Sequence, residues 1–499
     1  MTNVTQWVAV IPTAVLGLGG MVLALAPRGE ERIPAFGALA LLLVALSVPF
    51  LFEGGYTAGV GASGVLSAGL FGAGFLHDPV TWFFTVLVLT GTLVVVAMSF
   101  GRLKSLGISS SPEYYGLLLM TSASAIVLVG AGELITLFVG LEALSLGLYC
   151  LCGSAVSSRR SVEGALKYFI LGSFSSAFLL YGMSVLYGVT GSTELAVIAR
   201  ELVSVRQIPA IFGVGMILVG VFFKLGAVPF HFWAPDVYQG APTPVTAYMA
   251  SVVKAAALAM AMRLLWIGFG HVEVAGWWLG SAWTVALLTM IVGNIVAVRQ
   301  RNVKRMLAYS SVAHVGYMTA ALLTPGARAA GGGALLFYIV AYSVVTFGAF
   351  AVTMAVTGDR VDQPSADDIS SFAGLSRTNP RIAAAMTLFL LTLAGLPPGI
   401  VGLVGKFYLL SVVVQSHFVG LAVVAAICSA ISCYFYLRVI SAMYVQQATD
   451  VTPPHFVSPL GTRIVIGSMV AASIILGVSP SFVHNRAQAV AHGVFVRQP

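Results

Sequence analysis

The stretch MILVGVFFKLGAVPFHFWAP (216–235) decides the fold of this chain. An apolar run of the kind that crosses a bilayer contains one lysine, Lys224, and is followed by Pro229 and Pro235. Proline within a helix removes a backbone hydrogen bond and clashes with the preceding turn. A lysine and a broken helix at membrane depth are tolerated where they are buried in protein or line a watery cavity. The stretch therefore predicts an interrupted membrane helix inside a helical bundle.

The whole chain has the composition of an integral membrane protein. Of its 499 residues, 59% are hydrophobic and 8% are charged, and the mean hydropathy is +0.97. Soluble globular proteins carry about 25% charged residues, so this chain cannot cover a water-facing surface. A cytosolic enzyme and a nucleic-acid-binding protein are thereby excluded. The first apolar run has no basic segment or small-residue cleavage site before it, which predicts a retained span rather than a signal peptide.

Apolar runs of about 20 residues predict an all-α integral membrane protein with about fourteen transmembrane helices. The predicted spans are 7–26, 34–52, 78–99, 113–130, 132–152, 163–188, 209–227, 244–267, 278–298, 303–323, 332–356, 382–411, 418–446 and 462–479. A second break, LPPG (396–399), lies in span twelve, five spans after the first break in span seven. The odd offset reverses the direction of the helix, and oppositely directed broken helices are typical of inverted repeats.

The breaks divide the predicted polytopic domain, residues 1–499, into four parts. We expect two inverted five-helix repeats, spans 4–8 and spans 9–13, each with one broken helix. The expected parts are an N-terminal three-helix segment (1–110), a first repeat (111–270), a second repeat (275–447) and a C-terminal helix with its tail (460–499).

The loop charges predict the orientation. One side collects Arg28, Arg32, Arg102, Lys104, Arg159, Arg160, Lys167, Arg299, Arg301, Lys304, Arg305, Arg360, Arg377, Arg381, Arg438 and Arg463. The other side has only Arg200, Arg206, Arg263, Arg328, Arg486 and Arg497. Basic loops stay in the cytoplasm, so both termini are expected on the periplasmic side of a bacterial inner membrane.

Three lysines and one glutamate lie deep inside predicted spans. They are Lys224, Lys254, Lys406 and Glu142. A lysine at mid-bilayer costs on the order of 3 kcal/mol, so three of them require an explanation. Glu142 is the natural counter-ion for Lys224, because a nearby carboxylate favours the ammonium while burial disfavours it. A structural lock between helices is the alternative, but three lysines and two broken helices together favour ion translocation.

Three further residues are weaker candidates for the same pathway. His314 in SVAHVGY (311–317) and His231 in the first break are candidate proton relays, although a lone buried histidine is more often a hydrogen-bonded packing residue. Glu133 lies near an exit or caps span five. Glu163 and Lys167 are spaced as a solvated i,i+4 pair.

Several motifs now resemble one family. FKLGAVPFHFWAPDVYQGAP (223–242) closely resembles the signature of the antiporter-like membrane subunits of respiratory complex I, NADH:quinone oxidoreductase. LFVGLEALSLGLYCL (137–151), RNVKRMLAYSSVAHVGYM (301–318) and LPPGIVGLVGKFYLL (396–410) add three matches, and the likeness covers essentially the whole chain. The wording APDVYQGAP (234–242) separates the chain from subunits L and M, which usually read closer to LPDAHTEAP.

The resemblance implies a proton-translocating subunit without a redox centre. It implies that Glu142 and Lys224 form a controlling pair, that Lys254 is the central relay and that Lys406 belongs to the far half-channel. It also implies that FMN, iron–sulfur clusters and quinone are bound by other subunits. The implied partners are the lipid bilayer and other membrane-arm subunits, especially the neighbouring antiporter-like subunit M and subunit K, and not nucleic acid.

Three rival functions remain at the level of sequence. A subunit of a multi-subunit cation/proton antiporter or of a membrane-bound hydrogenase would share the broken helices and lysines, but the APDVYQGAP wording argues against both. A non-transporting assembly scaffold would use the charges only as locks. A redox subunit would need haem or metal ligands, and neither the histidines nor the four cysteines have a suitable spacing, so no metal site is expected.

Overall fold

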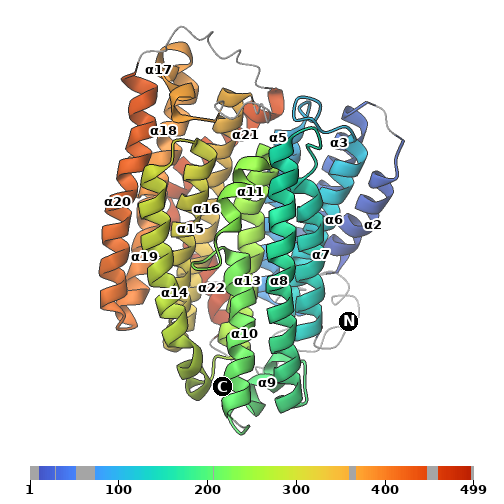
Figure 1. The fold of residues 1–499 in the computed structure, drawn as a ribbon, viewed down its shortest axis with the longest axis vertical. Coiled ribbons are helices and arrows are strands. Elements are labelled where there is room, and N and C mark those ends of the chain that lie inside the picture. The colour runs from blue at the N-terminus through green and yellow to red at the C-terminus, as the bar shows by residue number, and fades with distance from the viewer. Residues whose placement is uncertain are drawn as a thin grey trace.

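The chain folds into one bundle of helices. The computed structural model describes residues 10–27, 30–51, 74–205, 207–358, 367–446 and 459–495. In this part of the chain there is no β-sheet, only three isolated bridges between loops. The helices run side by side along the long axis, with α20 at one edge and α2 and α3 at the opposite edge (Figure 1). The all-α prediction is therefore confirmed.

The helices have the following bounds. The first group is α2 (Ile11–Ala24), α3 (Arg32–Leu51), α5 (Pro79–Ser99), α6 (Ser111–Gly130), α7 (Leu134–Cys152), α8 (Arg159–Thr190), α9 (Leu195–Glu201), α10 (Gln207–Leu225) and α11 (Trp233–Gly240). One continuous segment then comprises α12 (Thr243–Tyr248), the π-helical turn η1 (Met249–Val253), α13 (Lys254–Met262) and the π-helical turn η2 (Arg263–Gly268). The last group is α14 (Val272–Arg299), α15 (Val303–Leu322), α16 (Arg328–Thr357), α17 (Leu375–Thr378), α18 (Pro380–Ala394), α19 (Ile400–Gln415), α20 (Val419–Tyr444), α21 (Leu460–Val478) and α22 (Pro480–Phe495), with short 3₁₀ turns at 325–327 and 369–372.

The helices agree with an integral membrane protein. Within the described ranges, eleven helices are long and apolar enough to cross a membrane, and α2, α18 and α19 are shorter apolar helices. Each predicted span falls on a helix, or on two helices separated by a break, but α15 is not among the eleven. The count of fourteen crossings and the inverted repeats therefore stay predictions.

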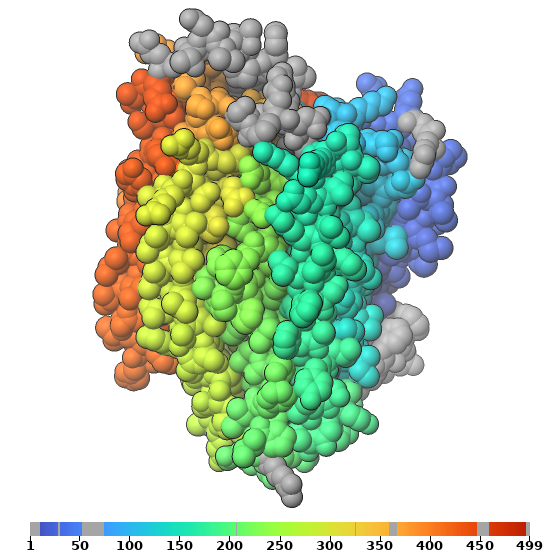
Figure 2. Space-filling view, in the orientation of Figure 1, coloured from blue at the N-terminus to red at the C-terminus, as the bar shows by residue number. Residues whose placement is uncertain are grey.

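The centre of the bundle is the segment from α12 to η2. Every residue from Thr243 to Gly268 is buried, and α16 is nearly as enclosed. The space-filling view shows α8, α10 and α14 on one face, where α10 packs against each of the other two (Figure 2). Outer helices instead expose large apolar side chains such as Phe174 on α8 and Phe407 on α19. This arrangement keeps the side chains of Lys224, Lys254 and Lys406 buried and leaves an apolar surface outside.

Both broken helices end their first half in the same way. Gly226 follows α10 with φ +75°, and Gly395 follows α18 with φ +81°. The N–H groups of Gly226 and of the next residue donate to Phe223 O and Phe222 O at 2.9 and 2.8 Å. The N–H groups of Gly395 and of its successor donate to Thr392 O and Leu391 O at 3.1 and 2.9 Å. A left-handed glycine with these two bonds is the Schellman ending of a helix.

The role predicted for Pro235 is wrong. The first break covers residues 226–232, and Pro235 lies in the first turn of α11. The backbone N–H groups of a first turn have no intrahelical acceptor, so a proline is tolerated there. Of the two prolines, only Pro229 lies in the break.

The loop assignment of two arginines is also wrong. Arg263 begins η2 and is fully buried. Arg438 lies inside α20 and donates to Val298 O at 2.8 Å and to Gln300 O, which are carbonyls at the end of α14. A cation at a helix C-terminus satisfies carbonyls that lack intrahelical donors. Arg438 was counted on the more basic side and Arg263 on the other side. Each count falls by one, so the difference between the two sides stays the same. Arg28, Arg206, Arg360 and Arg497 lie outside the described residues.

Candidate functional site: a buried lysine pathway

Lys254 lies at the centre of the bundle. It begins α13 directly after the π-helical turn η1, and its side chain is 4% exposed. Its Nζ donates to the backbone oxygen of Ser311 at 2.9 Å and also to the Ser311 hydroxyl. That hydroxyl is 2.7 Å from the Tyr342 hydroxyl. Lys254 is therefore held by uncharged oxygens on α15, the helix that carries His314.

Lys406 lies beside the second break. Its Nζ donates to Ala394 O and to Ser429 Oγ, both at 2.8 Å. Ala394 is the last residue of α18, where the helix leaves its carbonyls without intrahelical donors. The ammonium group also lies 5.4 Å from the centroid of the Tyr317 ring. The C-terminal end of α18, which carries partial negative charge, therefore lies next to the buried Lys406 ammonium.

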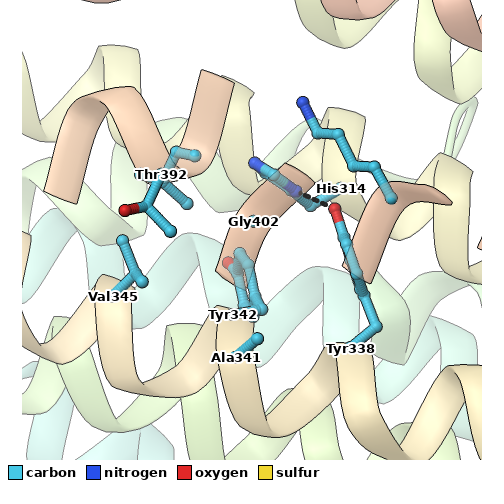
Figure 3. Close-up of a pocket in the computed structure, with 9 residues that line it drawn as sticks. His314, Tyr338, Ala341, Tyr342, Val345, Thr392 and Gly402 are labelled. Carbon is cyan, nitrogen blue, oxygen red and sulfur yellow. Dashed lines mark hydrogen bonds between the residues drawn. The ribbon is translucent and has the colours of Figure 1, made fainter. Parts of the chain in front are cut away.

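His314 lies between these two lysines. Its Nδ1 is 2.6 Å from the Tyr338 hydroxyl and its Nε2 is 3.5 Å from the Tyr436 hydroxyl. A small cavity, with about 10 Å³ open to the centre of a water molecule, is lined by His314, Tyr338, Tyr342 and Lys406 among others (Figure 3). A cavity needs about 10–15 Å³ of such space to hold one water. One water there would bring His314 and Lys406 into the same hydrogen-bonded group.

Glu142 and Lys224, which were predicted to be counter-ions, interact electrostatically in the structure but make no direct hydrogen bond. Lys224 donates instead to Ser145 Oγ at 2.7 Å and to the Tyr168 hydroxyl at 3.4 Å. Glu142 is half-buried and accepts a hydrogen bond from Ser176. Ser145 follows Glu142 by one turn of α7 and occupies the place next to the ammonium. Among the described residues, no ion pair joins the two.

A second small cavity lies beside Lys224. Ser145, Ser175, Ser176 and Tyr149 are among its lining residues, and about 10 Å³ is open to the centre of a water molecule. The hydroxyl partner of Glu142 and the hydroxyl partner of Lys224 therefore face one space. A water molecule in it would connect the carboxylate and the ammonium indirectly.

The other two weaker candidates, His231 and Glu133, have different surroundings. His231 lies in the first break, buried, with its ring 6.3 Å from that of Tyr309, and its Nδ1 has no hydrogen-bond partner. No hydrogen bond joins it to any of the three lysines in the described structure. Glu133 is the residue before α7, and its carboxylate accepts bonds from Thr136 and Thr193 at 2.9 and 3.2 Å. Glu133 thus ties the start of α7 to the loop before α9.

Sequence reasoning missed a buried ion pair. The Arg263 guanidinium donates to both Asp78 oxygens at 2.9 and 3.0 Å, to Val129 O at 2.6 Å and to Thr81 Oγ1 at 2.7 Å. The side chains of Arg263 and Asp78 are 0% and 1% exposed, so the two charges are removed from solvent together. The detectable signal was an arginine inside the apolar run 255–269.

Sequence reasoning also saw only half of a charge cluster. Lys167 contacts Glu163 at 2.9 Å as expected, but it also contacts Asp236 at 2.9 Å. Asp236 forms a second ion pair, with Arg305, at 2.5 Å. Burial acts to raise the pKa of Asp236, but the hydrogen bonds from Lys167 and Arg305 hold it below its usual value. The cluster joins α8, α11 and α15.

Comparison with known proteins assigns the family. The family model described as NADH:quinone oxidoreductase/Mrp antiporter, TM, matches residues 131–471. The chain belongs to this family of antiporter-like membrane subunits. It is 39% identical over 496 residues to the NADH-quinone oxidoreductase subunit N of Gemmatimonas aurantiaca, a match that covers 95% of this chain and 91% of that protein.

Solved structures extend the comparison. A chain of respiratory complex I from Thermus thermophilus is 32% identical, with a TM-score of 0.77 over 96% of this chain and 98% of that chain. A chain of the Mrp complex from a Dietzia species has a TM-score of 0.84 over 99% of this chain and 98% of that chain, at 20% identity. The second likeness concerns the fold alone.

Proposed function

We propose that this chain is the antiporter-like subunit N of a bacterial NADH:quinone oxidoreductase and that it moves protons through a buried lysine pathway. The named relatives and the Thermus complex support the assignment to that complex. The observation that carries the pathway is the environment of Lys254 and Lys406. Both are buried ammonium groups held by uncharged oxygens, with His314 and a water-sized cavity between them.

In this proposal a proton enters from the cytoplasmic side and reaches Lys224 and then Lys254. From Lys254 it passes through Ser311 and the tyrosines around His314 to Lys406, and it leaves toward the periplasm. The hydroxyl groups that contact each ammonium can both donate and accept hydrogen bonds. They can therefore pass a proton on without leaving a charge behind.

Glu142 supplies the control. Because it is half-buried on α7 and separated from Lys224 by hydroxyl groups, its distance from the ammonium can change when a neighbouring subunit moves or changes charge. Moving one charge against 100 mV costs about 2.3 kcal/mol. A change of two pKa units in a lysine corresponds to about 2.7 kcal/mol. A modest rearrangement of the pair is therefore large enough to drive transfer.

The wider setting follows from the same proposal. NADH oxidation and quinone reduction take place in other subunits, which hold FMN and the iron–sulfur clusters. The partners are the other membrane-arm subunits, with subunits M and K as neighbours, in the bacterial inner membrane with both termini periplasmic. Glu133 and His231 have no assigned step in the pathway.

The test is proton pumping per NADH in vesicles that contain the Lys406→Ala complex, with assembly checked on a native gel. We expect an assembled complex with a reduced ratio, because α18 keeps its end but the pathway loses its last ammonium. Lys104→Ala, which changes an exposed loop lysine, is the matched control. An unchanged ratio in assembled Lys406→Ala complex would remove Lys406 from the pathway, and a Na⁺-dependent ratio would favour a cation antiporter.

A further inference from the structure

The sequence predicted no residue that connects Lys224 with Lys254. In the structure two tyrosines, Tyr168 and Tyr238, lie along this connection. Tyr168 of α8 is fully buried, and its hydroxyl is 3.4 Å from Lys224 Nζ. The Tyr168 ring stacks on the Trp233 indole at 4.4 Å and an interplanar angle of 14°. Trp233 is the first residue of α11, so this stack joins the surroundings of Lys224 to the helix after the first break.

Tyr238 continues from that stack toward Lys254. It lies on α11, with its ring 6.3 Å from that of Trp233, and it is fully buried. Its hydroxyl interacts with the Ser311 hydroxyl and lies near that of Tyr342, although neither is within 3.5 Å in hydrogen-bonding geometry. Ser311 is the residue that holds Lys254. A buried phenol beside the hydroxyl that holds a lysine is placed to exchange a proton with that hydroxyl.

The charge cluster fixes α11 in this place. Asp236 lies two residues before Tyr238, and its ion pairs go to Lys167 on α8 and Arg305 on α15. Lys167 is the chain neighbour of Tyr168, and Arg305 is on the same helix as Ser311. The cluster therefore ties α11 to the two helices that carry the ends of the connection.

We propose that Tyr168 and Tyr238 carry protons between Lys224 and Lys254. This inference rests on the proposed function and names the inner part of its pathway. The Lys224 ammonium gives a proton to the Tyr168 oxygen while the Tyr168 O–H proton passes, through water, to the Tyr238 oxygen. Tyr238 gives its own proton to Ser311 Oγ, and Ser311 gives its proton to the amine of Lys254. Each hydroxyl loses one proton and gains one, so the net change is a neutral Lys224 and a charged Lys254.

The test is Tyr238→Phe in the complete complex. The substitution keeps the ring that fills the core and removes only the oxygen. We expect an assembled complex in which NADH-driven proton pumping is slower by roughly tenfold, with a larger ratio of rates in H2O and D2O. Tyr115→Phe is the matched control, because Tyr115 is a fully buried tyrosine of α6 whose hydroxyl also has no partner. It is expected to pump as the unaltered complex does.

The other outcomes separate the two proposals. Normal pumping and a normal isotope ratio in Tyr238→Phe, with pumping lost in Lys224→Ala and Lys254→Ala, would overturn the tyrosine connection and leave the lysine pathway standing. Normal pumping in the lysine variants as well would overturn the proposed function itself. If Tyr238→Phe does not assemble, Tyr168→Phe tests the same connection from the Lys224 end, and normal pumping there overturns it.

Discussion

Uncharged hydrogen-bond partners distinguish the three lysines of the proposed pathway from Arg263. Lys254 and Lys406 contact backbone carbonyls and serine hydroxyls, whereas Arg263 is held by the Asp78 carboxylate. A carboxylate in direct contact fixes a cation in its charged form, and neutral oxygens do so less strongly. The three lysines are therefore suited to exchange a proton, and Arg263 is suited to hold two elements together.

Replacement of Asp78 by Ala tests the structural role of that ion pair. The change leaves the Arg263 guanidinium buried without its anion, which typically costs about 3–5 kcal/mol. We expect less assembled complex and a lower midpoint in a thermal unfolding scan. The double variant Asp78→Ala, Arg263→Met removes both charges and should recover part of the loss. A single variant as stable as the unaltered complex would contradict this role.

Replacement of Gly395 by Ala tests the second break. The residue has φ +81°, where a side chain costs about 1–2 kcal/mol. A Cβ there would also be 3.1 Å from Cδ of Lys406. We expect lower stability together with reduced pumping, measured on the assembled complex. Gly280→Ala is the control, since its Cβ would meet open space in α14. Equal behaviour of the two variants would show that the left-handed position is not needed.

At the scale of elements, sequence predicted where helices lie better than how they end. The apolar runs located the helices, and Pro229 and LPPG located both breaks. Gly226 and Gly395, which end the first halves, were not used, although a glycine before a proline is a helix-stop signal. The π-helical turns on either side of α13 left no pattern in the sequence. They depend on packing from all sides in the most enclosed segment of the bundle.

The candidate site was predicted unevenly for the same reason. A charge in an apolar run is visible in sequence, so the three lysines were found. Their partners are serines, tyrosines and a backbone carbonyl from other helices, and these residue types are common in membrane helices. The pairing of Glu142 with Lys224 was predicted from charge alone. The two interact electrostatically, but the direct partner of the ammonium is the Ser145 hydroxyl on the same helix, which charge could not reveal.

The charge cluster around Asp236 predicts a dependence on pH. Its folded pKa lies below its unfolded value, so its stabilising effect is complete above about pH 4 and is lost as the pH falls through the folded pKa. Below that range α11 should loosen from α8 and α15. Amide hydrogen exchange of residues 233–240, corrected for the intrinsic rate, should therefore rise at pH 3 relative to pH 7. Asp236→Asn should show the faster exchange already at pH 7, and equal exchange in both proteins at pH 7 would contradict the prediction.

At the scale of the whole molecule, basic residues gather at one end of the bundle. α17 and the start of α18 lie at the upper end in Figure 1, and α9 lies at the lower end. Arg377 in α17 and Arg381 at the start of α18 lie at the upper end. Since positively charged loops remain in the cytoplasm, the upper end should be cytoplasmic.

Cysteine labelling tests this orientation. Thr378, the last residue of α17, and Ser204, after α9, are both exposed, and each can be changed to cysteine in a Cys150→Ser background. In sealed right-side-out vesicles, a membrane-impermeant maleimide should label the Ser204→Cys protein and not the Thr378→Cys protein. Inverted vesicles should give the opposite result. The reverse pattern would place the basic end in the periplasm.

The contact between Lys406 and the last carbonyl of α18 gives the second break a mechanical property. The Lys406 ammonium on α19 holds the C-terminal end of α18 through this hydrogen bond. When the proton leaves, the remaining amine holds that carbonyl more weakly, and the joint becomes more compliant. The chain would thereby convert the presence of a single proton into the stiffness of a hinge, which neighbouring subunits could sense as a change of shape.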